Sequence, residues 1–73
     1  MQSSVLNIIN QIRTKKGFLP LDTLSDTSSL RNDLGMDSLD LAELTVRIED
    51  EFNVDIFADG IIQTVGEVYA KLS

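Results

Sequence analysis

Ser38 is the side chain of this sequence best placed to do chemistry, and its surroundings limit what that chemistry can be. The chain contains no histidine and no cysteine, so it offers neither an imidazole base nor a thiol nucleophile. No Gly-x-Ser-x-Gly elbow surrounds Ser38. A serine without a base can still receive a group from another enzyme. We therefore interpret Ser38 as a passive attachment point and predict no catalytic residue.

A purely structural explanation of Ser38 must be weighed against this one, because serine is common in the first turn of a helix. Free backbone N–H groups and the positive end of the helix dipole would favour a phosphodiester there. The neighbouring acids oppose such an anion. Position alone does not separate the two explanations.

Carboxylates are the other groups that could do chemistry. Asp22, Asp26, Asp33 and Asp37 do not follow the ligand order, central glycine and terminal glutamate of a calcium loop, so we predict no metal site. A hydrolase or isomerase that uses paired carboxylates would need them in a pocket that raises their pKa values. These acids are predicted to lie on solvated helix faces. We expect that the chain is not an enzyme.

Charge and hydropathy limit the class of partner. The 73 residues include twelve acids and six bases, which gives a net charge of −6. This charge repels nucleic acid and anionic membranes, and it favours protein partners with basic patches. No segment approaches the roughly 20 apolar residues of a membrane span, and the start lacks the pattern of a secretory signal. We expect one monomeric, cytoplasmic domain over residues 1–73 that binds neither nucleic acid nor membrane.

Helical periodicity predicts the elements that would position Ser38. Apolar residues recur at helical spacing through residues 4–16, and Gly17 ends this first predicted helix. Residues 17–37 are rich in turn-forming types, which predicts a long loop. Apolar side chains should anchor the loop and keep it ordered. The expected anchors are Phe18, Leu19, Leu21, Leu24, Leu30 and Leu34.

A second helix is predicted over residues 38–52, with Asp37 as N-cap and Asp40 as its partner in a capping box. Residues 55–62 surround a glycine and predict a short, frayed third helix. Thr64 and Glu67 form a capping box that begins a last helix to the C-terminus. The predicted fold is all-α, a small four-helix bundle with a long ordered loop between its first two helices.

The predicted helix 38–52 has two apolar faces. At about 100° per residue, one face carries the side chains that a core requires. These are Leu41, Leu44, Ile48 and Phe52. The opposite side forms an apolar seam with acids along its margins, made of Leu39, Ala42 and Val46 with Glu43, Glu49 and Asp50. The seam is either ordinary surface or a docking face, in which acids steer a basic partner and apolar groups supply burial.

The segment Asp33-Leu34-Gly35-Met36-Asp37-Ser38-Leu39-Asp40 resembles the phosphopantetheine attachment motif of acyl carrier proteins, whose core is Asp-Ser-Leu. The similarity continues through Glu43-Leu44, residues 48–52 and Thr64-Val65, so it covers nearly the whole chain. It implies that Ser38, flanked by Asp37 and Leu39, carries a covalent 4'-phosphopantetheine arm derived from coenzyme A. Acyl intermediates would be held as thioesters on the thiol of that arm, because the chain itself has none.

The resemblance also implies partners. They would be a phosphopantetheinyl transferase and acyltransferase, ketosynthase or acyl-activating enzymes with basic docking patches. The implied contact residues are Asp37, Leu39, Asp40, Glu43, Val46, Arg47, Glu49 and Asp50. Arg47 stands where bacterial fatty-acid carriers usually have a small neutral residue, and residues 56–64 are shorter than in those carriers.

These departures leave the pathway open between fatty-acid synthesis and a polyketide or related specialised pathway, with a slight preference for the second. Peptidyl carriers usually show Gly-Gly-x-Ser, whereas this chain has Gly35-Met36-Asp37-Ser38. A peptidyl carrier is therefore the alternative within the superfamily. An unmodified acidic interaction module is the alternative from another class, and modification of Ser38 separates it from a carrier.

Overall fold

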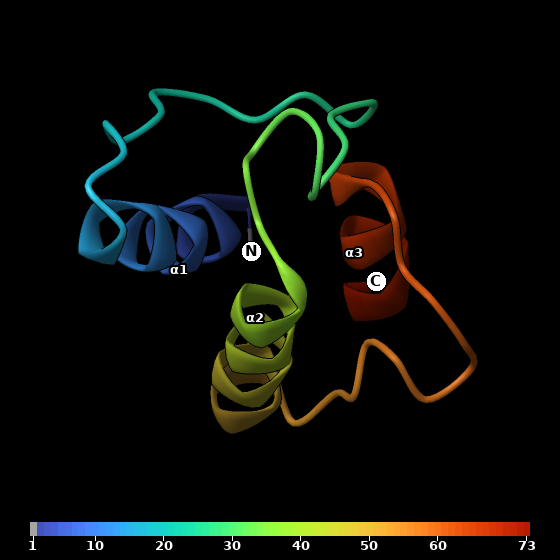
Figure 1. Ribbon diagram of the computed structural model, residues 1–73. Coiled ribbons are helices and arrows are strands. Elements are labelled where there is room, and N and C mark those ends of the chain that lie inside the picture. The colour runs from blue at the N-terminus through green and yellow to red at the C-terminus, as the bar shows by residue number, and fades with distance from the viewer. Residues whose placement is uncertain (1) are drawn as a thin grey trace.

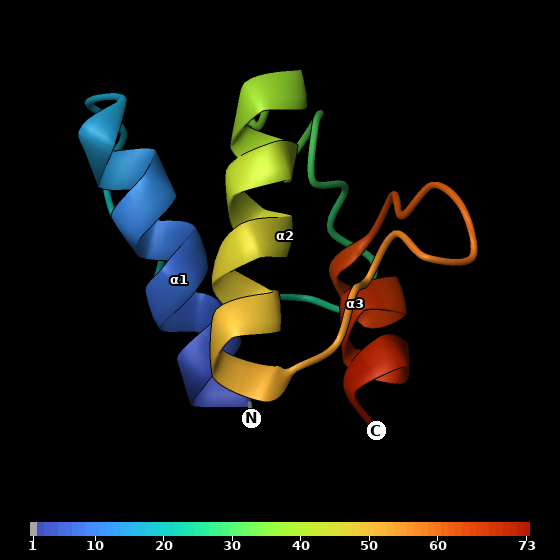
Figure 2. The ribbon, with the colours of Figure 1, turned by 90° about the horizontal axis from the view of Figure 1, so that it is seen from below.

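The computed structural model describes residues 2–73, and within that range it contains three α-helices and no strand (Figure 1). They are α1 (Gln2–Lys15), α2 (Ser38–Phe52) and α3 (Val65–Leu72). Seen from the side, α2 lies between the other two helices (Figure 2). The predicted all-α class is confirmed. None of these helices has the length and apolar character needed to cross a membrane.

The core forms where the apolar faces of the three helices meet. Leu44 and Ile48 of α2 are fully buried against Ile9 of α1 and Val68 of α3, all within one cluster. Burying one such side chain contributes about 1.5–3 kcal/mol, so this cluster stabilises the fold of a chain that has no cysteine. The predicted core face of α2 is confirmed, with Phe52 packed at its edge. The buried apolar residues are Val5, Ile8, Ile9, Ile12, Leu30, Leu34, Met36, Leu41, Leu44, Ile48, Ile56, Ile62, Val65 and Val68.

Local chemistry sets the helix boundaries. Helix α2 begins and ends where the sequence predicts, and α1 begins two residues and ends one residue before the predicted bounds. Gly17 adopts a left-handed φ of 85° just after α1. Asn53 ends α2 in the same region, at φ 59°, and its N–H donates to the carbonyl of Glu49 at 2.8 Å. Asparagine is one of the few residues besides glycine that tolerates this conformation.

The loop between α1 and α2 is held by only some of its predicted anchors. Leu30 and Leu34 are buried, and Leu21 and Leu24 pack against the core. Leu19 is 81% exposed, so the prediction that it anchors the loop is wrong. Phe18 is 41% exposed, but its ring packs against Gly35 near the other end of the loop and so helps to hold it.

Polar side chains of α1 hold the first part of the loop, where Leu19 does not. The amide of Asn10 accepts a hydrogen bond from the N–H of Leu21 at 2.8 Å and donates to its carbonyl at 2.9 Å. Arg13 donates to the carbonyls of Leu19 at 3.0 Å and Leu34 at 2.7 Å. Because these bonds bind the loop backbone itself, the first part of the loop can follow α1 with Leu19 exposed.

The predicted helix over residues 55–62 is not formed. Its hydrogen bonds join Ala58 to Asp55 and Gly60 to Phe57, each at 3.2 Å, which closes turns of i to i+3 type. The carboxylate of Asp55 accepts the N–H of Phe57 at 3.0 Å and so competes with helical hydrogen bonding. Gly60 then takes a φ of 134°, outside any helix. Burial of Ile56 fixes this segment without helical structure.

The start of α3 is bound to the long loop by backbone hydrogen bonds. The N–H groups of Val65 and Gly66 donate to the carbonyls of Ser28 at 3.0 Å and Asp26 at 2.8 Å. Thr64 is the N-cap, as predicted, and its hydroxyl accepts the N–H of Glu67 at 3.3 Å. The loop therefore satisfies amides that a helix N-terminus leaves unpaired.

This close approach leaves no room for a side chain at Gly66, where a Cβ would lie 2.9 Å from the carbonyl oxygen of Asp26. Gly66→Ala should lower the free energy of unfolding by about 1–2 kcal/mol, because overpacking outweighs the gain in helix propensity. Chemical denaturation measures this change. Without the clash, alanine would stabilise the helix by up to about 1 kcal/mol, so any increase in stability would contradict the packing described here.

Candidate functional site

Ser38 is the first residue of α2 and is exposed. Its hydroxyl oxygen accepts a hydrogen bond from Nη2 of Arg31 at 3.1 Å. The two residues meet because the loop folds back: Leu30 and Met36 are both buried, and the N–H of Met36 donates to the carbonyl of Leu30 at 3.0 Å. Residues 31–35 therefore form a short excursion that places the guanidinium beside Ser38.

A capping box immediately behind Ser38 fixes the start of α2. The N–H of Asp40 donates to the carboxylate of Asp37 at 2.9 Å, and the N–H of Asp37 donates to the carboxylate of Asp40 at 3.0 Å. Both halves of the predicted box are confirmed. Because the capping box flanks Ser38, the carboxylates of Asp37 and Asp40 set the direction of the backbone at Ser38.

Lys16 completes this arrangement from the end of α1. Its ammonium group lies 2.5 Å from Oδ2 of Asp40 and donates to the carbonyl of Gly35 at 2.8 Å. Burial acts to raise the pKa of Asp40, but the hydrogen bond from Lys16, with those at Asp37, outweighs it and lowers the pKa. Asp40 is thus a buried, charged structural group, and its carboxylate is already bound within the chain.

The hydroxyl of Ser38 is held by a donor, and the chain has no histidine. The guanidinium of Arg31 only donates, so the serine oxygen serves as its acceptor. Asp37, the exposed acid next to it, has one carboxylate oxygen bound in the capping box. The site presents an exposed hydroxyl that another protein can reach.

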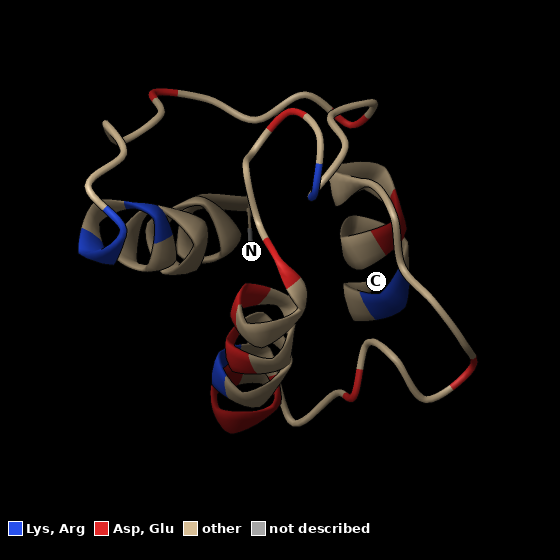
Figure 3. Ribbon diagram, in the orientation of Figure 1, with Lys and Arg blue, Asp and Glu red and all other residues tan. Residues whose placement is uncertain are grey.

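The predicted apolar seam on α2 is exposed, as the helical wheel indicates. Leu39 is 82% and Val46 68% exposed, and Ala42 lies open between them. Glu49 and Asp50 are also exposed. The seam begins one residue after Ser38, so a protein that reaches the serine can contact it. Acidic residues occupy much of the same helix (Figure 3).

Glu43 and Arg47 lie between α2 and α1 rather than along an open margin. Nζ of Lys15 is 2.8 Å from both carboxylate oxygens of Glu43, and Nε of Arg47 donates to Glu43 at 2.8 Å. Hydrogen bonds from Lys15 and Arg47 lower the pKa of Glu43. Sequence reasoning missed this network because one partner, Lys15, is 28 residues away.

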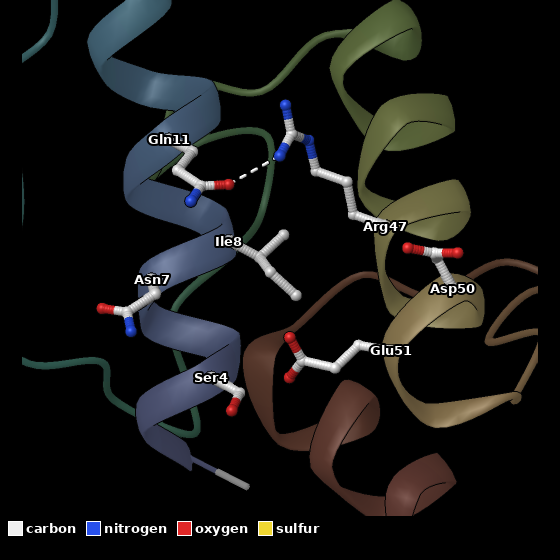
Figure 4. A pocket seen from close by; sticks show the side chains of 7 residues that line it. All are labelled: Ser4, Asn7, Ile8, Gln11, Arg47, Asp50 and Glu51. Carbon is white, nitrogen blue, oxygen red and sulfur yellow. Dashed lines mark hydrogen bonds between the residues drawn. The ribbon is translucent and has the colours of Figure 1, made fainter.

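A polar groove lies between α1 and α2, and Arg47 of this network lines it (Figure 4). Nη1 of Arg47 donates to Oε1 of Gln11 at 2.6 Å across the groove. None of the residues around Ser38 lines it. The groove residues are Ser4, Asn7, Ile8, Gln11, Arg47, Asp50 and Glu51.

Arg31 and Lys16 are the two site residues that the sequence did not indicate. Arg31 precedes Ser38 by seven residues within a loop that has no regular period, and Lys16 lies 24 residues before Asp40. The one feature of the sequence that could have indicated Arg31 is that it is a basic residue within the acidic stretch before Ser38.

Comparisons with known proteins agree with the geometry of the serine site. The family model described as "Phosphopantetheine attachment site" matches residues 8–72. A curated acyl carrier protein from Saccharopolyspora erythraea is 35% identical over 69 residues, which cover 92% of this chain and 73% of that relative. No solved structure matches the chain.

The bonds to Asp40 predict how acid affects stability. Its pKa is lowered on folding, so the stability it contributes is full above its ordinary value of 3.8 and is lost as pH falls through the folded value. Asp40→Asn should cost about 0.5–2 kcal/mol near pH 7, because the ion pair with Lys16 is lost. It should also reduce the loss of unfolding free energy between about pH 5 and pH 2. Denaturation curves across this range, compared with wild type, measure both effects; an equal acid loss in both proteins would contradict the role given to Asp40.

Proposed function

Since the chain belongs to the phosphopantetheine-binding family as an acyl carrier protein, we propose that Ser38 is the residue that receives the covalent 4'-phosphopantetheine arm. The observation that carries this proposal is an exposed serine hydroxyl at the start of α2, bonded to a guanidinium, in a chain without histidine or cysteine. The surroundings fit a phosphodiester, since a helix N-terminus and an arginine both favour an anion. The thiol of the arm holds acyl groups as thioesters.

Attachment requires a second protein. In the reaction, Oγ of Ser38 forms a bond to the phosphorus that carries the pantetheine, the pyrophosphate bond of coenzyme A breaks, and adenosine 3',5'-bisphosphate leaves. The serine proton must go to a base of the transferase, because Arg31 cannot accept it and the chain has no histidine. This chain contributes an accessible nucleophile oxygen in a fixed orientation, and it has no catalytic role of its own.

The exposed seam of α2 supports the docking of enzymes beside the attachment point. Leu39 and Val46 supply apolar area, and Asp37, Glu49 and Asp50 supply negative charge for a basic patch. Glu43 and Arg47 contribute through the rigid contact of α1 with α2. We expect the transferase and acyltransferase, ketosynthase or acyl-activating enzymes to share this face. Polyketide or other specialised synthesis remains our prediction for the pathway, and the cytoplasm for the compartment.

Intact mass tests the attachment site. After incubation with coenzyme A and a broad-specificity phosphopantetheinyl transferase, wild type should gain one phosphopantetheine and Ser38→Ala should gain none. Ser3→Ala, which changes an exposed serine of α1, is the matched control and should be modified like wild type. A gain in Ser38→Ala would move the site elsewhere. No gain in folded wild type would favour an unmodified interaction module.

Two substitutions on α2 separate docking from folding. Val46→Ser should weaken transferase binding by about 1 kcal/mol and barely alter thermal stability, because the side chain is largely exposed. Glu43→Gln should instead lower the unfolding free energy by about 0.5–1 kcal/mol, since it breaks the bonds to Lys15 and Arg47. Titration calorimetry measures the free energy of transferase binding, and thermal denaturation measures the stability of each variant. Unchanged binding in a folded Val46→Ser protein would remove Val46 from the docking face.

A further inference from the structure

The basic side chains of this protein are nearly all committed to other groups of the chain. Within residues 2–73, five of the six bind a carboxylate or a backbone carbonyl, and they are Arg13, Lys15, Lys16, Arg47 and Lys71. Arg31 is the exception. Its hydrogen bond goes to the neutral hydroxyl of Ser38, and it forms no ion pair with any carboxylate of the described residues.

This exception is unexpected in a chain with twice as many acids as bases. Asp37 is adjacent to Ser38, yet its recorded ion pair is with Lys16, at 3.9 Å. A guanidinium has five N–H donors in a planar fork, and one hydrogen bond to a hydroxyl uses few of them. The cation next to the attachment serine therefore keeps most of its capacity to bind an anion.

A phosphodiester on Ser38 would place an anion at this position. Asp37 and Asp40 would repel it, and Lys16 is already bound to Asp40. Arginine suits phosphate oxygens better than lysine does, because its fork can donate two parallel hydrogen bonds. Once Oγ is esterified it becomes a poorer acceptor, whereas the two non-bridging phosphate oxygens beside it are strong ones.

We propose that Arg31 is the counter-charge of the phosphodiester and a positioning residue for the base of the arm. This inference rests on the proposed attachment to Ser38. Arg31 also lines a groove with Ser29, Asn32 and residues 61–63, and Ser38 is not among the residues of that groove. A contact between the phosphodiester and Arg31 would restrict the base of the arm to the neighbourhood of this side chain.

Arginine side-chain spectra test the inference directly. The chain has three arginines, so the Nε–Hε region of a proton–nitrogen spectrum should show three signals, and Arg31→Lys identifies one of them. On modification of wild type, the Arg31 signal should shift clearly, while those of Arg13 and Arg47 stay near their positions. Mass spectrometry of the same sample shows whether the arm is attached.

Melting temperatures of the unmodified and modified forms of each variant give an independent measurement. The change in melting temperature on modification should be about 1–4 °C more favourable in wild type than in Arg31→Gln, the range expected for one exposed charge pair in a small domain. Lys71→Gln is the control with the same charge change, because Lys71 binds Asp59 and lies outside the site. It should reproduce the wild-type difference, and Arg31→Lys should recover part of it.

The outcomes distinguish the two proposals. Complete modification with an unmoved Arg31 signal and equal thermal differences in wild type and Arg31→Gln would overturn the role of Arg31 and leave Ser38 as the attachment site. An equal loss in Lys71→Gln would reduce the effect to net charge and would also overturn it. Absence of modification in folded wild type would overturn both proposals.

Discussion

The buried carboxylate of Asp40 joins three parts of the molecule, and the geometry around Ser38 depends on it. It accepts the backbone N–H of Asp37, and it binds the ammonium of Lys16 at the end of α1. Lys16 in turn donates to the carbonyl of Gly35 in the loop. A buried charge is tolerated only when its partners are present, so the cap, the loop and α1 must form together. Ser38 is oriented as a result of this shared requirement.

Helix α2 has a buried face toward the core and an exposed apolar face on its opposite side. Leu44 and Ile48 face the core, and Leu39 and Val46 face outward. Between them, Glu43 binds Lys15 and Arg47 binds Gln11, both of α1. These polar contacts act with core packing to set the rotation of α2, so the exposed seam keeps its direction relative to Ser38. A partner can therefore contact the seam and the serine at once.

The sequence predicts those features that depend on neighbouring residues. Asp37 and Asp40 are three residues apart, and their capping box sets the start of α2 where the pattern places it. The helix expected over residues 55–62 fails for an equally local reason, because Asp55 and Gly60 favour turns more strongly than a wheel of apolar residues indicates. Leu19 fails as an anchor because polar side chains of α1 hold the loop backbone without it.

Charge pairs between residues far apart in the sequence could not be predicted from it. Glu43 reads as one free acid among several, yet Lys15 neutralises it across the α1–α2 contact, and Lys71 binds Asp59 in the same manner. Each such pair engages one base, although Lys15 itself stays largely exposed. Glu49 and Asp50 of α2 are exposed and form none of the ion pairs found among the described residues. Arg13 binds backbone carbonyls instead of a carboxylate, and Arg31 binds the hydroxyl of Ser38, which we propose as the attachment point. On this proposal, the distribution of the cations, rather than their number, leaves acids exposed for partners and places one guanidinium where a phosphate would be attached.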